Sequence, residues 1–568
     1  MTSDNTNSLS IGAYILLRLK QIGIDTVFGV PGDFNMPLLD LIEDDAELTW
    51  GNNANELNAA YAADGYARVR GMGAVVTAFG VGELSAINGI AGSYSEMVPV
   101  IHIVGTPRTA SQKSGALLHH TLGNGDFDVF FKMGSMVTVA AANLTLANAT
   151  AEVDRVILAA YTNKRPGYIA LPFDLIHATV QVPVELPLLD FAAPKNPVQV
   201  QEVAVKQILS AISEAKHPVV IVDGAVIRHG LQSAATDFVN RAGFPTFSTM
   251  MGKNAIDETV SNYRGIYTGA VTLEGVREEI EKADLLIEVG CIKSDFNTGN
   301  FSYGFQNTKK ICLNSHGTTI GHAEYAGVGM HELLPSLTAA LPGLKHQAEL
   351  SPRVMPAPID TSSNQITHNY LWNKVPEYIA PNSIVVSETG TAEFGVANMQ
   401  SPKGATFIGQ ILWGSIGYSV GAAVGAAFAD RSRKVYLFVG DGSFQLTVQE
   451  ISVFIRQGLT PVIFLLNNDG YLMEKLIHGP ERSYNNFQMW DYSKTLEYFG
   501  GHLETNKSNG KNPSLIGLEA KVETRQEFEN AMEFVNQQPD KIHFLEVVMP
   551  EFDSPRELSL LCALSENR

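Results

Sequence analysis

The chain has 568 residues, with 40 Lys and Arg against 59 Asp and Glu, and a net charge of −19. This acidic balance argues against a protein that binds nucleic acid or an anionic membrane. Its three cysteines are too few for a disulfide framework. They also lack the spacing of metal ligands, which argues against a cysteine-based metal site. We find no signal or transit peptide pattern and no apolar run long enough to cross a bilayer, so we expect a soluble cytoplasmic protein.

The length predicts about three domains. Two Pro-rich stretches, Val182–Val198 and Leu341–Asn364, are interpreted as linkers, which places the domains at residues 1–183, 199–342 and 363–568. In each domain, apolar runs typical of strands alternate with helical patterns, and this predicts α/β domains with doubly wound parallel sheets. The expected strands are Thr26–Gly29, Gly73–Thr77, Pro99–Val104, Pro218–Val222, Asp284–Val289, Lys310–Leu313, Ser383–Ser387, Lys434–Val439, Pro461–Leu466 and Phe544–Val548.

The first domain contains polar residues at places where a ligand could meet them. Asp33 follows the first expected strand, at the edge of the sheet. Glu56 opens the predicted helix Glu56–Arg70, where the helix dipole stabilises a carboxylate. Helix capping alone would explain Glu56, but the alanine-rich turns behind it would let a flat ligand approach closely. His119 and His120 are adjacent and cannot both face a core, so at least one should meet solvent or a ligand.

The third domain contains two polar turns, each at the end of an apolar strand. Gly440–Ser443 ends one strand and Asn467–Gly470 ends the next, with 24 residues from Ser443 to Leu466 leading from the first turn to the second. The segment Phe444–Arg456 between them is expected to be a helix. Its expected inward positions are Leu446, Ile451, Phe454 and Ile455.

A strand–helix–strand unit places both turns at the same edge of a parallel sheet. There Asp441 and Asn468 offer the hard oxygens that Mg²⁺ prefers, and the helix N-terminus offers N–H groups to a phosphate. Either turn alone is an ordinary turn sequence, but the pair favours a magnesium-bound diphosphate. Glu474 comes four residues after Gly470, within about one helical turn of this site, unless it serves to pair with Lys475 or to cap a helix.

Together these motifs resemble the thiamine-diphosphate-dependent 2-oxo acid decarboxylases, most closely the fungal pyruvate decarboxylases. The resemblance runs nearly end to end. It is carried by Thr26–Asp33, Glu56–Arg68, His119–Gly123, Glu388–Thr391, Trp413–Gly417 and Leu466–Gly479. The histidine pair separates the decarboxylases from acetolactate synthases of the same fold, which usually hold FAD in the middle domain. This chain has no Gly-x-Gly-x-x-Gly after a strand there, so we expect a Rossmann-like middle domain without a dinucleotide.

The resemblance implies a role for each matched residue. Glu56 would hydrogen-bond the aminopyrimidine ring and favour its imino tautomer, and Ile416 would hold the bound cofactor in its bent shape. The remaining implied contacts are Thr391 and Gly414 with the aminopyrimidine, Asp441, Asn468 and the Gly470 carbonyl with Mg²⁺, and Gly442 and Ser443 with the diphosphate. The implied substrate pocket consists of Phe296, Met473 and Ile477.

By the same resemblance, Asp33, His119, His120 and Glu474 form a proton relay around the reacting carbon. After CO₂ leaves, that carbon must be protonated before the aldehyde can depart. Two carboxylates in one dry cavity disfavour a second ionisation, so we expect one of them to be protonated during part of the cycle. In this family the first domain of one subunit meets the third domain of another. A homodimer is therefore the smallest expected assembly, and a homotetramer is consistent with it.

Some positions depart from the family pattern and bear on substrate choice. Leu472 and Met473 stand where Thr-Ile is usual, and Ala78 replaces a common Thr or Tyr. Glu393 occupies a position that is small in many yeast-type enzymes and a bulky aromatic in some bacterial ones. A carboxylate in an anion pocket would repel a 2-oxo acid unless it is neutral or turned away, and of these two alternatives we expect Glu393 to point outward. After the strand Pro218–Val222 the chain lacks the cysteine found in related yeast enzymes with substrate activation.

We therefore expect pyruvate as the substrate, converted to acetaldehyde and CO₂ without oxidation. The alternatives are a phenylpyruvate, indolepyruvate or branched-chain 2-oxo acid decarboxylase with a wider pocket. A non-catalytic relative that binds thiamine diphosphate as a regulatory signal is a third reading, but it should have lost relay residues that are all present here.

Overall fold

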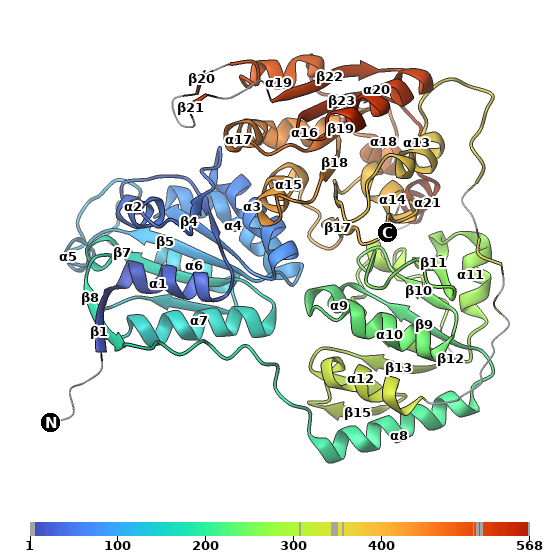
Figure 1. Cartoon of the computed structure of the whole chain (residues 1–568), viewed down its shortest axis with the longest axis horizontal. Helices are drawn as coiled ribbons and strands as arrows, with labels where there is room; N and C mark the ends of the chain where they lie inside the picture. The colour runs from blue at the N-terminus through green and yellow to red at the C-terminus, as the bar shows by residue number, and fades with distance from the viewer. Residues whose placement is uncertain are drawn as a thin grey trace.

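The computed structural model consists of three α/β groups that follow one another along the chain (Figure 1). It describes residues 6–305, 308–341, 350, 352–354, 357–503, 505–506, 510–511 and 515–565. Each group is built on one main sheet, with six, seven and six strands in chain order. Of the two expected linkers, Val182–Val198 is extended between Pro183 and Val198, while Leu341–Asn364 lies partly outside the described residues. Among the described helices, none combines the length and apolar character needed to cross a membrane.

The N-terminal sheet is parallel throughout, in the order β3-β2-β4-β5-β7-β6. Its strands are β2 (Thr26–Gly29), β3 (Thr49–Trp50), β4 (Gly73–Ala78), β5 (Val100–Thr106), β6 (Ala140–Asn143) and β7 (Gly167–Pro172). Its helices are α1 (Ile11–Gln21), α2 (Met36–Glu43), α3 (Glu56–Arg70), α4 (Val81–Ser95), α5 (Thr109–Lys113), α6 (Val129–Met136) and α7 (Ala149–Asn163). A separate antiparallel pair joins β1 (Thr6–Ser10) to β8 (Thr179–Pro183). The three strands expected in this part of the chain are confirmed, as is the helix that begins at Glu56.

The middle sheet has the order β11-β10-β9-β12-β13-β14-β15. Its strands are β9 (Pro218–Val222), β10 (Thr246–Ser248), β11 (Tyr263–Ile266), β12 (Leu285–Val289), β13 (Lys309–Leu313), β14 (Gly317–Ile320) and β15 (Ala323–Ala326). Its helices are α8 (Val198–Glu214), α9 (Gly224–Arg228), α10 (Gln232–Ala242), α11 (Glu274–Glu281) and α12 (Met330–Ala340). The last two strands run antiparallel, because the connection Asn314–His316 is too short for the crossover that a parallel neighbour needs.

The C-terminal sheet is again parallel, in the order β17-β16-β18-β19-β23-β22. Its strands are β16 (Ile384–Ser387), β17 (Thr406–Ile408), β18 (Val435–Gly440), β19 (Val462–Asn467), β22 (Ile516–Val522) and β23 (Ile542–Val548). Its helices are α13 (His368–Lys374), α14 (Thr391–Asn398), α15 (Tyr418–Ala429), α16 (Asp441–Thr447), α17 (Ile451–Gln457), α18 (Leu472–His478), α19 (Thr495–Tyr498), α20 (Arg525–Gln537) and α21 (Arg556–Ser565). Strands β18 and β19 are neighbours, so the two polar turns share one edge as expected.

The expectation of one continuous helix at Phe444–Arg456 is wrong, because the structure has two helices there. A 3₁₀ turn, Val448–Glu450, separates α16 from α17, and Thr447 at its start leaves helical geometry with φ −138°. The interruption changes which side chains face inward. Leu446 is 54% exposed, whereas the other three expected inward positions are buried.

Helix α3 packs against α15 of the C-terminal group, and the two helices lie side by side in Figure 1. The contact is very close, since a Cβ atom at Gly65 would lie 2.1 Å from the carbonyl oxygen of Ala422. The small residues of α3 therefore admit a second helix, not the flat ligand expected from the sequence. The buried core of the N-terminal group continues through this contact into the C-terminal group.

Candidate active site

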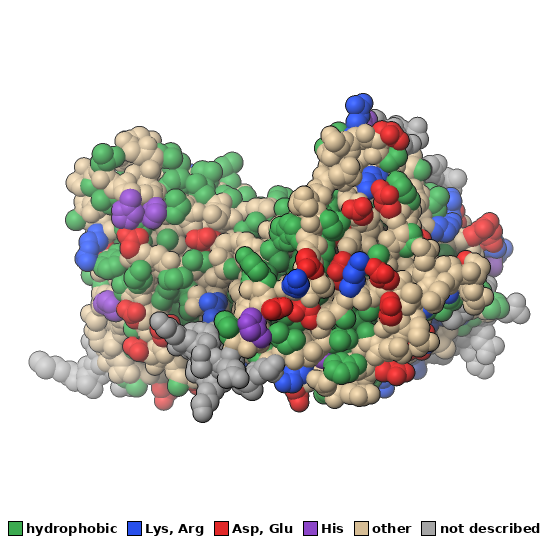
Figure 2. All heavy atoms as spheres, turned by 90° about the horizontal axis from the view of Figure 1, so that it is seen from above, with side chains coloured by type: hydrophobic (Ala, Val, Ile, Leu, Met, Phe, Trp, Pro, Cys, Tyr) green, Lys and Arg blue, Asp and Glu red, His purple; other side chains and the backbone are tan. Residues whose placement is uncertain are grey.

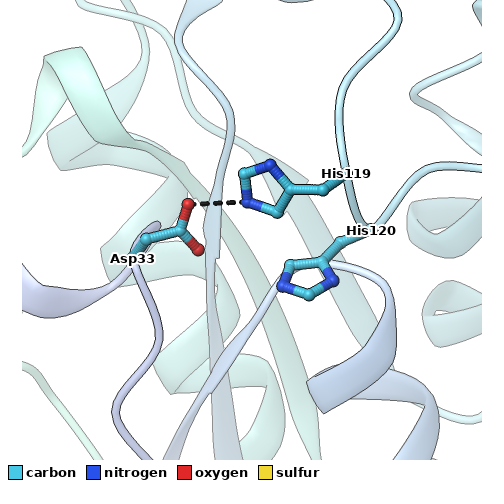
Figure 3. Close-up of side chains that lie close together, drawn as sticks. All are labelled: Asp33, His119 and His120. Atoms are coloured by element: carbon cyan, nitrogen blue, oxygen red, sulfur yellow. Dashed lines mark hydrogen bonds and ion pairs between the residues drawn. The ribbon is translucent and has the colours of Figure 1, made fainter.

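The Asp33 carboxylate and the two histidines come together at the edge of the N-terminal sheet (Figure 3). Asp33 lies between β2 and α2, and the histidines lie in the loop between α5 and α6. The Nε2 atom of His119 is 2.7 Å from Asp33 Oδ2, and the ring of Phe34 stacks on His119. His120 adopts φ +61° and places its ring 4.6 Å from that of His119. The histidine loop also lies against Gly80, where a Cβ atom would be 2.2 Å from the His120 carbonyl oxygen.

Glu56 occupies the first position of α3 and is partly exposed. The Asn55 side chain caps the helix by accepting a hydrogen bond from the backbone N–H of Asn58, so Glu56 is not needed as the cap. Its Oε1 atom lies 3.1 Å from the place that a Cβ atom at Gly82 would take. The Glu56 carboxylate therefore lies over the first turn of α4, and the absence of a side chain at Gly82 leaves space for it there.

The two polar turns of the C-terminal sheet meet as predicted. The Asp441 carboxylate is buried and accepts hydrogen bonds from the backbone N–H groups of Gly442, at 2.8 Å, and Gly470, at 3.2 Å. The Asn468 side chain donates to the Gly470 carbonyl oxygen. Burial raises the pKa of Asp441 to about 6, although the backbone N–H donors around it act in the opposite direction. This oxygen-rich, desolvated group fits a divalent cation such as Mg²⁺.

Beside this turn the backbone leaves space for a bound group. A Cβ atom at Gly440 or at Gly390 would meet no other atom within 4 Å. Ser443 lies in the first turn of α16, and Thr391 opens α14. The N-termini of these helices point backbone N–H groups toward this space, and such groups suit a diphosphate.

The loop that carries Gly414 and Ile416 is fixed from the N-terminal group. The buried carboxylate of Glu96 accepts hydrogen bonds from the backbone N–H groups of Leu412, at 2.7 Å, and Trp413, at 3.0 Å. Gly414 has φ +61°, a conformation that glycine adopts without strain. Ile416 projects from this loop and is 40% exposed, so its side chain is available to a ligand.

Glu474 is exposed in the first turn of α18. The alternative pairing with Lys475 is not formed, because Lys475 donates to the Asp469 carbonyl and to Glu551. The expected pocket residues Phe296, Met473 and Ile477 pack into one apolar cluster with residues of α14 and α21. Phe296 of the middle group therefore shares a cluster with residues of α18, and its ring centroid lies 6.3 Å from that of Phe394 in α14.

The expectation that Glu393 points outward is wrong. Its side chain is buried, accepts a hydrogen bond from the hydroxyl of Ser387, and lies beside Gly409. Burial raises the pKa of Glu393 to about 8, with the neighbouring Glu96 carboxylate adding to the effect. A carboxylic acid that stays neutral at pH 7 can be buried without a cationic partner, so the burial of Glu393 favours the neutral alternative over the outward orientation.

Within one chain the site is in two halves. Asp33, Glu56 and the histidines belong to the N-terminal group, whereas the metal turn and Glu474 belong to the C-terminal group (Figure 1). Across the part of the chain that the structure describes, no hydrogen bond or ion pair joins these two sets. Sequence reasoning also missed Glu450, a fully buried carboxylate. The available signal was its spacing of four from Phe454, which places a charge on the apolar face of the expected helix.

Comparisons with known proteins agree with this geometry. Three family models match: the N-terminal TPP binding domain of thiamine pyrophosphate enzymes at residues 9–128, their central domain at 205–339, and their C-terminal TPP binding domain at 388–537. The chain belongs to the thiamine pyrophosphate enzymes. The expected family and the expected cofactor, thiamine diphosphate, are confirmed.

The chain is similar over almost its whole length to curated fungal enzymes. The pyruvate decarboxylase of Hanseniaspora uvarum is 43% identical over 562 residues, which are 97% of either chain. Pyruvate decarboxylase isozyme 1 of Saccharomyces cerevisiae is 41% identical over 562 residues, again 97% of either chain. A solved structure, the thiamine diphosphate-dependent 4-hydroxybenzoylformate decarboxylase of Rhodococcus jostii RHA1, matches with a TM-score of 0.77. At 19% identity, covering 96% of this chain and 100% of that one, it supports the fold alone.

Proposed function

We propose that this chain catalyses the non-oxidative decarboxylation of a 2-oxo acid, with pyruvate converted to acetaldehyde and CO₂. The observation that carries the proposal is the contact of His119 with Asp33 in a chain of this family, because a carboxylate and an imidazole in hydrogen-bond contact can hold and pass a proton. The full-length similarity to fungal pyruvate decarboxylases supports pyruvate over other 2-oxo acids.

In this proposal the two ends of the cofactor are held by different parts of the chain. Residues 363–568 bind the diphosphate, with Mg²⁺ held by Asp441, Asn468 and the Gly470 carbonyl, and with Gly442 and Ser443 at the helix end. Residues 1–183 would bind the aminopyrimidine through Glu56, Thr391 and Gly414 would also contact that ring, and Ile416 would support the bound cofactor. When bound, thiamine diphosphate accepts the electrons that are left as CO₂ departs.

The residues of the chain then move the proton that completes the reaction. Asp33, His119, His120 and Glu474 would surround the reacting carbon and deliver the proton to it. Phe296, Met473 and Ile477 exclude water from the substrate side chain. Residues 199–342 supply Phe296 and carry no cofactor of their own.

We propose further that the complete site needs two copies of this cytoplasmic chain, as a homodimer or a homotetramer. Large apolar side chains remain exposed around both halves of the site in a single chain. They include Val81, Leu117, Leu122, Ile416 and Leu446. The face drawn in Figure 2 is hollowed near its middle and carries hydrophobic side chains on both sides of the hollow. A second copy covering such a surface would bring Glu56 of one chain to Asp441 of the other.

The proposal is tested by a coupled assay in which an alcohol dehydrogenase reduces the aldehyde released by the purified protein. We expect turnover of pyruvate that requires both thiamine diphosphate and Mg²⁺ and that is lost after treatment with EDTA. The Asp441→Asn variant is the matched control, since it keeps the fold but weakens the cation site. Absence of aldehyde from the fully loaded protein would refute the proposal, and faster turnover of phenylpyruvate would favour the wide-pocket alternative.

A further inference from the structure

A buried carboxylate of the C-terminal group holds the loop that precedes Glu56. Glu450 is 0% exposed and belongs to the 3₁₀ turn between α16 and α17. Its Oε1 atom accepts a hydrogen bond of 2.6 Å from the Asn53 side-chain amide, and its Oε2 atom accepts one of 3.2 Å from the backbone N–H of Ala54. Both donors lie in the loop between β3 and α3, so a single side chain of one group fixes a loop of another.

The same loop is tied to the strand that leads to Asp33. The Oδ1 atom of Asn53 accepts from the backbone N–H of Gly29 at 3.0 Å, and the Asn53 N–H donates to the Gly29 carbonyl at 3.0 Å. Asn53 therefore connects Glu450 to the end of β2. Glu56 follows three residues after Asn53, and Asp33 follows four residues after Gly29. Both acidic residues therefore follow closely after residues of one hydrogen-bond chain that ends at the buried Glu450.

A second side chain of the C-terminal group reaches this loop more weakly. The Gln457 side chain reaches the carbonyl oxygens of Trp50 and Gly51 only at 3.4 and 3.3 Å, which are long hydrogen bonds. Glu450 accepts from the Asn53 side chain at the much shorter distance of 2.6 Å. Burial raises the pKa of Glu450, and the hydrogen bonds from Asn53 and Ala54 oppose this rise without cancelling it.

We propose that Glu450 is a positioning residue: from within the same chain, it fixes the orientation of Glu56 and Asp33 toward the bound cofactor and substrate. The inference rests on the proposed function only for the role of these two acids. A misplacement of about 1 Å at a reacting group costs on the order of 100-fold in rate, so a loosened loop affects the chemistry more than the binding of the cofactor. The diphosphate and the metal are held elsewhere, at Asp441 and Asn468.

The test exchanges the polarity of the Glu450–Asn53 pair. In Glu450→Gln the new amide faces the Asn53 amide or the Ala54 N–H, and one donor loses its acceptor. In the double variant Glu450→Gln/Asn53→Asp, the glutamine amide donates to the new carboxylate, and every donor regains an acceptor. Asn53→Asp alone places two carboxylates against each other. We expect both single variants to be impaired and the double variant to be restored.

The readouts are the affinity for thiamine diphosphate with Mg²⁺, by calorimetry, and the exchange rate of its C2 proton with D₂O on the protein, by quenched-flow NMR without substrate. On Glu450→Gln, we expect the C2 proton of thiamine diphosphate to exchange at least about tenfold more slowly than on the wild type, while the affinity for the cofactor changes less than about threefold. On the double variant, we expect the exchange rate to return to within about threefold of the wild-type rate. Glu258→Gln, which removes another buried carboxylate paired with Lys253, should lower thermal stability but leave exchange unchanged.

If Glu450→Gln does not fold, Glu450→Asp provides the same test, because it keeps the charge but withdraws the carboxylate by about 1.5 Å. Wild-type exchange in either folded single variant would overturn the proposal, and so would a double variant as slow as Glu450→Gln. The exchange assay needs no 2-oxo acid. Failure of pyruvate turnover with normal C2 exchange would therefore count against the proposed function and not against this role of Glu450.

Discussion

His119 Nε2 and Asp33 Oδ2 lie 2.7 Å apart although 86 residues separate them in the sequence. Both side chains are about half exposed, at 57% and 49%, so the contact adds little to stability and is available to a substrate. We expect Asp33→Asn, which keeps the shape but removes the proton acceptor, to lower kcat for pyruvate by about 100-fold or more. The unfolding temperature should stay within a few degrees of that of the wild type.

Asp44→Asn is the control for this prediction. Asp44 is also exposed in the N-terminal group, but it lies at the end of α2 and away from the histidines. It should leave kcat unchanged, which separates loss of the relay from loss of one surface charge. Asp33→Asn with the kcat of the wild type would show that this contact takes no part in the reaction.

Mixing two inactive variants tests whether the site is shared between chains. Glu56→Gln and Asp441→Asn should each be inactive as homo-oligomers. If Glu56 and the metal turn of one site come from different chains, a mixed dimer contains one intact site and one doubly altered site. Statistical exchange should then restore about a quarter of the wild-type activity. Refolding the variants together and separately, followed by the aldehyde assay, measures this, and no gain above the separate proteins would place both residues in the same chain.

Much of the fold follows from local sequence patterns. The expected strand Thr26–Gly29 and the helix from Glu56 to Arg70 are present with the expected bounds, because apolar runs and a capping asparagine are local signals. The meeting of Asp441 with Asn468 was also predictable, since the carboxyl ends of neighbouring parallel strands share an edge.

The failures arise where distant parts of the chain decide the outcome. At the break between α16 and α17, the Thr447 hydroxyl donates a hydrogen bond to the Gly417 carbonyl, and the Leu446 side chain is exposed. A helical pattern of apolar residues predicts neither feature. The alanines behind Glu56 face α15, which comes more than 350 residues later in the chain. Glu393 can be buried because its carboxyl group can be protonated, and the sequence alone does not give its protonation state.

Met473 is expected to limit the size of the substrate side chain. It packs with Phe296 and Ile477 in the apolar cluster beside Glu474. Met473→Ala should therefore enlarge the pocket and raise the ratio of kcat/KM for phenylpyruvate to kcat/KM for pyruvate by about tenfold or more. Leu560→Ala, at a partly exposed position of the neighbouring helix α21, is the control and should leave the ratio unchanged. An unchanged ratio in Met473→Ala would place the size limit elsewhere.

The buried Glu393 predicts a specific dependence of stability on pH. Its pKa rises from 4.5 in the unfolded chain to about 8 in the folded one, mainly through burial. Ser387, Glu96, Arg68 and Glu388 are the groups around it, and the pKa of Glu388 is likewise raised, to about 7. Between the two pKa values the unfolded chain has lost this proton and the folded chain has kept it. The free energy of unfolding should therefore fall as the pH rises from 4.5 toward about 8, and change no further above that.

Replacing Glu393 with its neutral isostere removes this linkage. Between pH 5.5 and 8, we expect the free energy of unfolding of Glu393→Gln to fall less steeply with pH than that of the wild type. The difference in free energy of unfolding, variant minus wild type, should therefore increase as the pH rises. Urea unfolding at several pH values measures the two slopes. Glu377→Gln, at an exposed carboxylate near the end of α13, should keep the slope of the wild type. Plots of the free energy of unfolding against pH that run parallel for Glu393→Gln and the wild type would contradict this prediction. They would mean that Glu393 is ionised in the folded protein and that a cation such as Arg68 stabilises its buried charge.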